Sequence, residues 1–416
     1  MKKQYVFALL AVVYLLMSIA SALDGGDFDV YLDAGSKILK QENIYAPPFV
    51  KGLQYYYSPL FALILSPLAG LNIHFIIELI WLILSGLMLV RIWTLVSSYF
   101  DISNLTHKEY YWWVGISFFL ILRFILYNIA MIQVTIFLLW MFLEGLRLVQ
   151  EKQFAFGAAI LALIINIKLM PIVVIPYLIY RGYFKAVGYT ILFVVAFLVL
   201  PGIFIGFDYN MFLHQEWWKI INPSNAEHVL EAEITYQSLV GMIPVFITST
   251  ESIIALKRNF IDLPVDQAIL ITNVLRLAVA GLTIYFMGMP FRKKVDSLSE
   301  IRAIAYLLMA IPLIFPHQQK YAFLFFLPSI IYLVYYIIQK RKVDQSVPFK
   351  LFIAFFVLIT IVFTPIIGSD IIGRYVYDVI QHYRILGICA FLFIPLLVMA
   401  KPAELNKILK NQSEDK

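Results

Sequence analysis

Long apolar runs dominate this chain and limit what it can fold into. Its 416 residues are 62% hydrophobic and only 14% charged, and the mean hydropathy is +0.85. An α-helix of roughly 20 apolar residues crosses the hydrocarbon core of a bilayer, and in lipid the backbone must satisfy its own hydrogen bonds. The composition therefore predicts an all-α polytopic membrane protein, which we expect to form a single integral membrane domain over residues 1–416.

Twelve segments are predicted to cross the membrane, approximately residues 5–23, 74–97, 110–127, 132–149, 154–167, 170–180, 184–206, 268–289, 301–315, 320–338, 349–367 and 384–400. The fifth and sixth are short and meet at Lys168 and Pro171. We expect these two to form a hairpin of short or tilted helices. The first segment follows two lysines, and we interpret it as a retained signal anchor rather than a cleaved signal peptide.

The distribution of basic residues predicts the orientation of the chain. With the N-terminus inside, 20 of the 32 Lys and Arg residues fall on the inner side, as the positive-inside rule requires. The net charge of +6 then reflects topology, and we expect no nucleic-acid partner. Both termini are predicted to be cytoplasmic in a bacterial plasma membrane, with long outer loops at about residues 24–73 and 207–267.

This orientation depends on the segment at residues 58–71. It has 14 residues and contains Pro59 and Pro67, so it is too short for an ordinary span. We expect a re-entrant or interfacial helix on the outer face. If this segment crossed, the later loops would change sides and the charge rule would fail.

Several kinds of soluble enzyme site are missing. The sequence has no Walker-type phosphate loop, no GxGxxG, no HExxH and no CxxC. The one cysteine, Cys389, lies in an apolar run, which excludes a disulfide framework and a cysteine metal site. We predict no cofactor, and no acidic cluster demands a divalent metal, so metal use stays open.

The stretch "DGGDFDVYLDAG", residues 24–35, begins the first outer loop and contains four aspartates. Its apolar residues recur at helical spacing, which predicts an amphipathic helix on the outer membrane surface. Asp29, Asp33 and Lys37 are four apart and are expected on the solvated face. Asp27 follows two glycines, where it is either an N-cap or a positioned base, ionised at the helix N-terminus.

The segments "DFDVYLDAG", "NIYAPP" and "YYYSPLFALILSPLAGL" together resemble the first outer loop of glycosyltransferase family 87, which belongs to the GT-C superfamily. That family's pattern corresponds here to Asp27, Tyr31, Tyr45, Tyr57 and Pro59. The resemblance implies a GT-C-like helix bundle and a polyprenyl-phosphate sugar, typically mannose, as donor. It also implies that Asp27 is the general base and that the sugar carbon is inverted.

Later segments are similar to further elements of the same family, namely "NIAMIQVTIFLL", "INIKLMPIVVIPYLIYRGYFKA", "YQSLVG" and "PHQQKYAFLFFLP". The predicted threading brings the polar residues of these segments to the outer face or its membrane edge. With Asp27 as the catalytic residue, the candidate substrate-binding residues are Asp29, Tyr31, Tyr57, Gln133, Lys168, Gln237, His317 and Tyr321.

Transfer from a lipid phosphate to an alcohol needs a base, cations for the departing phosphate and an apolar groove. Lys168 interrupts an apolar run and either binds that phosphate or extends its amine to the interface. His317 is either a ligand of the phosphate or acceptor or a solvated loop histidine. Arg123 and Arg374 are further phosphate candidates near the outer edge.

The sequence therefore predicts a membrane glycosyltransferase that acts at the extracytoplasmic face. The expected partners are a polyprenyl-phosphate sugar donor, a lipid or glycan acceptor and membrane lipids. A transporter or flippase is the alternative, because polytopic proteins with intramembrane charges commonly move solutes. A non-catalytic scaffold is a third possibility. The long outer loops with their motifs, and the absence of a second Lys-Pro interruption, favour the enzyme.

The predicted topology can be tested by cysteine labelling. Cysteines substituted near Asn43 and Asn225, one in each long outer loop, should react with a membrane-impermeant reagent added to intact cells. Protection of either position until the membrane is opened would contradict the threading.

Overall fold

The fold is described by a computed structural model that covers residues 3–71, 73–222, 234–250, 252, 254–289, 291 and 294–414. Every regular element among these residues is helical, as the apolar runs predict. Part of the second predicted outer loop, residues 223–233, lies outside the described residues, and so does the labelling position Asn225.

Six of the described helices are long and apolar enough to cross a membrane: His74–Ser97, His107–Ala130, Phe184–Ile205, Val265–Met287, Ser297–Ile314 and Lys320–Arg341. The number becomes eight if each of two bent helix pairs counts as one span: Ala8–Asp24 with Asp27–Ile38, and Arg374–His382 with Ile385–Met399. These helices indicate a multi-pass membrane protein. The predicted number of about twelve spans is not confirmed.

Helix length explains the smaller number. Helices α6 (Thr135–Gln150), α7 (Phe154–Ile167) and α17 (Val347–Thr360) have 16, 14 and 14 residues. At 1.5 Å per residue these helices are about 21–24 Å long, whereas the hydrocarbon core is roughly 30 Å thick. The hydropathy pattern predicts the positions of these helices correctly, but the helices are too short for ordinary spans.

The chain divides into two compact units. The first contains residues 1–95, 126–179 and 183–222, and the second contains residues 96–125, 180–182 and 223–416. Helix α5 (His107–Ala130) contributes residues to both. The expectation that the whole chain forms one integral membrane domain stays a prediction.

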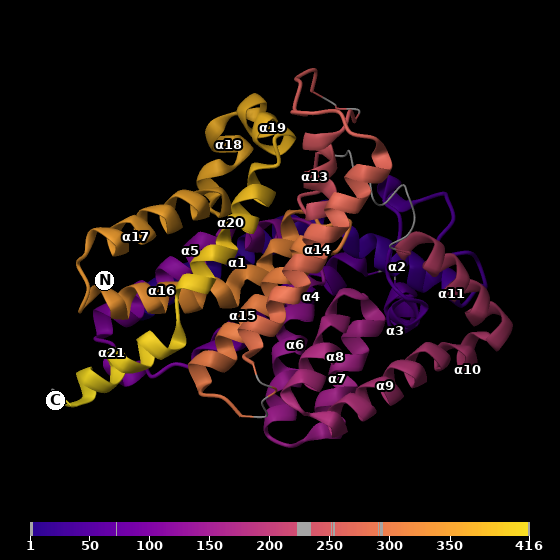
Figure 1. The fold of residues 1–416 in the computed structure, drawn as a ribbon. Helices are drawn as coiled ribbons and strands as arrows, with labels where there is room; N and C mark the ends of the chain where they lie inside the picture. The colour runs from indigo at the N-terminus through magenta and orange to yellow at the C-terminus, as the bar shows by residue number, and fades with distance from the viewer. Residues whose placement is uncertain are drawn as a thin grey trace. The chain divides into compact units, whose positions relative to one another are not determined.

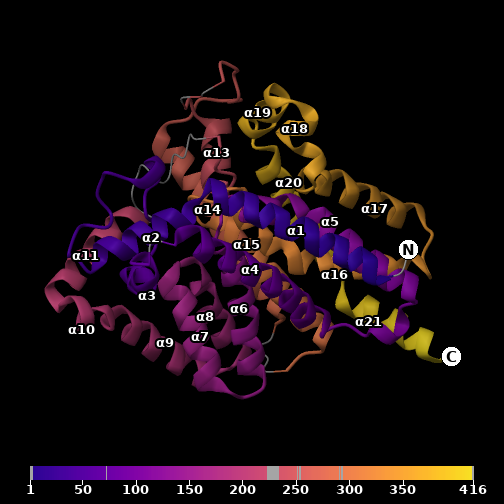
Figure 2. The ribbon, with the colours of Figure 1, turned by 180° about the vertical axis from the view of Figure 1, so that it is seen from behind.

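The first unit contains both short and long helices. Its elements are α1 (Lys3–Asp24), α2 (Asp27–Ile38), η1 (Val50–Gly52), α3 (Pro59–Ala69), α4 (His74–Ser97), α6, α7, η3 (Met170–Val173), α8 (Val174–Arg181), α9 (Phe184–Val199), α10 (Pro201–Ile205) and α11 (Phe207–Ile221). Helices α2 and α3 lie side by side in both views of the ribbon (Figures 1 and 2), and α7 packs against both α6 and α9.

Helix α2 confirms the predicted amphipathic helix, but protein covers most of its apolar face. Its buried residues are Phe28, Val30, Tyr31, Leu32, Ala34, Gly35 and Ile38. Gly35 permits the close approach of α3, because an added Cβ would lie 3.1 Å from backbone atoms of Leu65 and Ser66. On the polar side, Lys37 pairs with Asp33 at 2.7 Å, as the four-residue spacing predicts.

The segment predicted not to cross the membrane forms α3. This helix has 11 residues and begins after Ser58, whose hydroxyl accepts a hydrogen bond from the Phe61 N–H at 3.4 Å. Proline is tolerated at its first position, where the N–H would have no intrahelical partner. The length of α3 agrees with a helix that lies at the interface or dips into the membrane.

Two glycines control the junction between α1 and α2, where the axes bend by 51°. Gly25 has φ +64°, in the left-handed region that favours glycine. Gly26 lies against the loop after α5, because an added Cβ would be 2.6 Å from the Met131 carbonyl oxygen. The Asp27 N–H donates to the same oxygen at 2.9 Å. This contact fixes the start of α2 against a segment that is distant in sequence.

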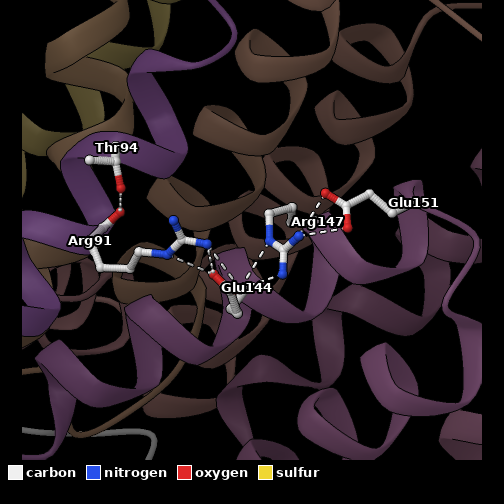
Figure 3. Close-up of polar contacts among 5 residues, drawn as sticks. All are labelled: Arg91, Thr94, Glu144, Arg147 and Glu151. Atoms are coloured by element: carbon white, nitrogen blue, oxygen red, sulfur yellow. Dashed lines mark hydrogen bonds and ion pairs between the residues drawn. The ribbon is translucent and has the colours of Figure 1, made fainter.

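A charged network joins α4 to α6 in the first unit (Figure 3). The Arg91 guanidinium contacts the Glu144 carboxylate at 3.1 Å, and Arg147 contacts both Glu144 and Glu151 at 2.6 Å. Each of these charges has a partner of opposite sign, as partly buried ionisable groups need. The predicted threading places this network on the inner side.

The second unit has a more deeply buried centre. Its elements are η2 (Ile102–Asn104), most of α5, α13 (Leu239–Ile247), α14 (Val265–Met287), α15 (Ser297–Ile314), η4 (Lys320–Phe326), α16 (Leu327–Arg341), α17, η5 (Ile361–Phe363), η6 (Pro365–Ile367), α18 (Ser369–Ile372), α19 (Arg374–His382), α20 (Ile385–Met399) and α21 (Pro402–Glu414). Helices α15 and α16 form its core, and most of their residues are buried. The indole N–H of Trp113 on α5 donates to the Ile331 carbonyl of α16 at 2.9 Å.

Gly26→Ala should destabilise the protein, because the new methyl group would overlap the Met131 carbonyl and push α2 away. Overpacking of this kind typically costs about 1–3 kcal/mol. Gly70→Ala is the matched control, since nothing lies within 4 Å of a Cβ there. Thermal unfolding in detergent should show a lower midpoint for Gly26→Ala alone, and equal midpoints for both variants would contradict the close approach.

Candidate active site

The candidate site of the first unit centres on the carboxylate of Asp27. Asp27 is the first residue of α2, and the N-cap residue is Gly26, which makes no side-chain cap. The carboxylate accepts a hydrogen bond from the Gln133 side-chain amide, 106 residues away in the sequence. Of the two alternatives that the sequence left open, the N-cap is wrong. Asp27 is instead held by a side chain from a different segment.

Gln133 lies in the loop between α5 and α6, directly after Ile132, whose φ is +47°. Its side chain is 2% exposed. The Tyr31 hydroxyl donates to Gln133 Oε1 at 3.4 Å, and the hydroxyl groups of Tyr31 and Tyr57 are 2.9 Å apart. Either hydroxyl can be the donor in the contact between Tyr31 and Tyr57. A chain of polar groups therefore runs from Tyr57 through Tyr31 and Gln133 to Asp27.

Lys168 joins this group from the end of α7. It is the C-cap residue of that helix, with an extended backbone, and its ammonium lies 5.2 Å from the centre of the Tyr57 ring. The preceding residue, Ile167, accepts a hydrogen bond from the Ser58 N–H at 3.4 Å, which ties this loop to the start of α3. Asp27 and Lys168 are both half-buried, so each retains surface that a substrate can reach.

Asp29 pairs with a lysine from a separate loop. Its carboxylate pairs with Lys51 at 2.8 Å, while Lys37 pairs with Asp33. Lys51 also donates to the Asp24 carbonyl at 3.0 Å. Helical spacing alone could not identify Lys51, because it lies on a separate loop.

Sequence reasoning missed Glu78. This residue of α4 is 1% exposed and interacts with the Asp29 carboxyl group. The available signal was a lone carboxylate in an apolar segment of membrane-spanning length, because such a group indicates function or a specific partner.

Burial shifts the pKa values of Asp27 and Lys168, and neighbouring charges oppose the shift in each case. Burial raises the pKa of Asp27, and the Gln133 hydrogen bond and the charges of Lys168 and Lys51 partly offset the rise. Its position at a helix N-terminus alone predicts that Asp27 stays ionised. Desolvation has the larger effect on the pKa of Asp27 here. Desolvation lowers the pKa of Lys168 to about 8, against the opposing effect of Asp27.

The tyrosines around residue 57 are largely internal. Tyr55 and Tyr57 are 2% and 5% exposed. The Tyr45 hydroxyl donates to the Tyr57 carbonyl at 2.8 Å, and the Tyr55 hydroxyl donates to the Ser58 carbonyl at 3.0 Å. These contacts favour a role in shaping the loop before α3, rather than an exposed aromatic belt.

The remaining predicted residues lie in the second unit. The Gln237 N–H donates to the Gln318 carbonyl at 3.0 Å, and the Tyr236 ring meets the His317 ring edge-on at 5.4 Å. The Gln237 side-chain amide donates to the Ile234 carbonyl at 2.9 Å. Gln237 and His317 therefore belong to one local cluster. Tyr321 is half-buried at the start of η4, four residues after His317.

Among the described residues, no group of three or more His, Cys, Asp or Glu side chains could hold a metal ion. The charges near Asp27 come from Lys168 and Lys51. The arrangement combines a carboxylate that has a raised pKa with a half-buried cation. Proton acceptance beside an anionic leaving group requires these two kinds of side chain.

A model of glycosyltransferase family 87 matches residues 55–316. The match covers more than half of the chain, and the protein belongs to this family. It is therefore a membrane glycosyltransferase. Tyr57, Gln133, Lys168 and Gln237 fall inside the matched range, whereas Asp27, His317 and Tyr321 fall outside it. No curated protein and no solved structure shows a significant match to the chain.

The two opposite pKa shifts predict a bell-shaped pH profile for sugar transfer. Asp27 accepts a proton only when ionised, so kcat/KM should rise with pH through its raised pKa. Lys168 is cationic below its pKa of about 8, so the rate should fall as pH rises through that value. Lys168→Arg should move the alkaline limb upward, because arginine stays protonated. An unmoved alkaline limb would show that Lys168 is not the group that titrates there.

Proposed function

We propose that the protein transfers a sugar from a polyprenyl-phosphate donor to a lipid or glycan acceptor at the extracytoplasmic face of the cell membrane. The observation that supports this reaction is the contact of Asp27 with Gln133, beside the ammonium of Lys168. Mannose as the sugar comes from the family resemblance. Cytoplasmic termini come from the distribution of basic residues.

In the proposed reaction, Asp27 takes the proton of an acceptor hydroxyl. The resulting oxygen nucleophile attacks the anomeric carbon from the face opposite the phosphate. The bond between that carbon and the phosphate oxygen breaks, and the polyprenyl phosphate leaves with both bonding electrons. One displacement of this kind inverts the configuration of the sugar carbon.

The neighbours of Asp27 supply orientation and charge. Gln133 donates to one carboxylate oxygen and accepts from Tyr31, so the carboxylate is fixed before the acceptor arrives. Lys168 offers a cation to the charge that develops on the departing phosphate. Such preorganised groups are effective in a water-poor site, because they need not reorient during the reaction.

Asp29, Lys51 and Glu78 support the same helix start. Lys51 pairs with Asp29 and bonds to the end of α1, and its charge also acts on Asp27. We assign these residues to positioning. Family membership sets aside the transporter and scaffold alternatives as the primary function.

Asp27→Asn tests the base directly, because the amide keeps the shape of the side chain but does not accept the proton. Loss of a general base typically lowers the rate about 100-fold to 10,000-fold. The substrate is a purified polyprenyl-phosphate mannose, and mass spectrometry of the lipid and acceptor pools measures turnover. Donor affinity should change little.

Asp33→Asn is the matched control on the same helix, because Asp33 pairs only with Lys37 on the polar side in the described contacts. It should keep near-normal turnover. If Asp27→Asn is folded and fully active, Asp27 is not the base. If neither variant nor the native protein transfers mannose but another polyprenyl-phosphate sugar is used, only the choice of sugar is wrong.

A further inference from the structure

A second cluster of cations lies in the second unit, which contains none of the residues assigned to the proposed reaction. Arg123 of α5, Lys320 of η4 and Tyr377 of α19 meet there, although nearly 200 residues separate the first two in the sequence. The Lys320 ammonium donates to the Tyr377 hydroxyl and lies 4.8 Å from the centre of its ring. The Arg123 guanidinium carbon lies 5.5 Å from the same centre. Two cations therefore meet at one phenol.

Both cations are removed from solvent. Arg123 and Lys320 are each 8% exposed. Arg123 Nη1 donates to the Val362 carbonyl at 2.7 Å, and the guanidinium also interacts with the Tyr377 hydroxyl. Its Nη2 atom is buried and makes no hydrogen bond to a described residue within 3.5 Å. No described carboxylate acts on the Arg123 guanidinium. A buried guanidinium with an unused donor is costly, and an anion placed there would satisfy it.

The acidic residue next to Tyr377 in the sequence already has a partner. Asp378 follows Tyr377 and pairs with Arg374 at 2.9 Å, and the Arg374 side chain is 79% exposed. Arg374 lies three residues before Tyr377 on α19, on the same side of the helix. Arg374 can therefore approach a ligand bound beside Tyr377.

Exposed apolar side chains border the cluster on the segments that carry Val362 and Tyr377. They are Ile361, Ile366, Ile371, Tyr375 and Val376, each at least 40% exposed. The neighbouring helices α5 and η4–α16 are long and apolar enough to cross a membrane. A charged head that binds the cations would therefore have apolar surface beside it for a hydrocarbon chain.

We propose that Arg123 and Lys320 bind the phosphate group of a membrane lipid, with the lipid chain along the apolar residues of 361–376. Phosphate matches the donors, because arginine offers a planar pair of N–H groups and lysine a mobile point charge. Basic residues beside lipid-facing helices commonly recognise lipid phosphates. This site does not depend on the role of Asp27.

Binding to the purified full-length protein tests the proposal, with native mass spectrometry as the readout. Separate arms add polyprenyl phosphate, phosphatidylglycerol, inorganic phosphate and the uncharged polyprenyl alcohol. Lys320→Met and Arg123→Gln should each weaken binding of a lipid phosphate about tenfold to a hundredfold, as expected for the loss of one charge-assisted hydrogen bond. Lys340→Met is the matched control, because Lys340 is a partly buried lysine of α16 that pairs with Glu404 at 2.7 Å.

The arms separate the possible sources of the phosphate. A loss confined to polyprenyl phosphate supports a site for the donor or product lipid, and a loss confined to phosphatidylglycerol supports a structural phospholipid. A loss for both supports general recognition of lipid phosphate. Unchanged binding of both lipids overturns the proposal, as does an effect on inorganic phosphate alone.

Two further measurements protect the test from misfolding of a variant. Lys320→Arg retains the charge and should bind the lipid as the native protein does. A polyprenyl phosphate with a photoreactive group near the phosphate, applied to the native protein, should label peptides from residues 361–377. Labelling only elsewhere overturns the proposal. Asp27→Asn should leave this binding unchanged, so the proposed reaction and the proposed lipid site can fail separately.

Discussion

The hydrogen bond between Asp27 and Gln133 is the interaction on which the candidate site depends. In a chain this apolar, a carboxylate loses its hydration and needs donors and cations in its place. Gln133 supplies the donor, and Lys168 and Lys51 supply the positive charge. The Tyr31 hydroxyl helps to hold Gln133 in place, because it donates a hydrogen bond to the amide oxygen at 3.4 Å. The result is a carboxylate with a raised pKa in a fixed position, the state that a general base requires.

The backbone makes this contact possible. Gly25 turns the chain at the end of α1, and Gly26 lets the start of α2 touch the Met131 carbonyl, one residue before the strained φ of Ile132. The same loop then presents Gln133. Main-chain contacts therefore bring together residues that are far apart in the sequence. The backbone places the side chains of the site, whatever conformations these side chains adopt.

Hydrophobic periodicity predicted the long apolar helices and α2, because apolar runs bounded by charged residues, proline or glycine leave few alternatives. It did not predict α11, α13, α19 or α21. It could not predict how many helices span the membrane, since α7 and α17 are apolar but only 14 residues long. The site was predicted in part. The family pattern pointed to Asp27, Tyr31, Tyr57, Gln133 and Lys168, whereas Lys51 and Glu78 act through tertiary contacts that no local spacing encodes.

Each unit contains a cation that is partly or fully buried, and the two cations are stabilised in different ways. In the first unit, the charge of Asp27 stabilises the ammonium of Lys168, so both ions have a partner within the protein. In the second unit, Arg123 has a carbonyl and the ring and hydroxyl of Tyr377 as partners, but no described carboxylate. A carbonyl dipole and a ring face offset less of the cost of burying a cation than a full opposite charge does. The first arrangement is suited to proton transfer and the second to holding an anion from outside the protein.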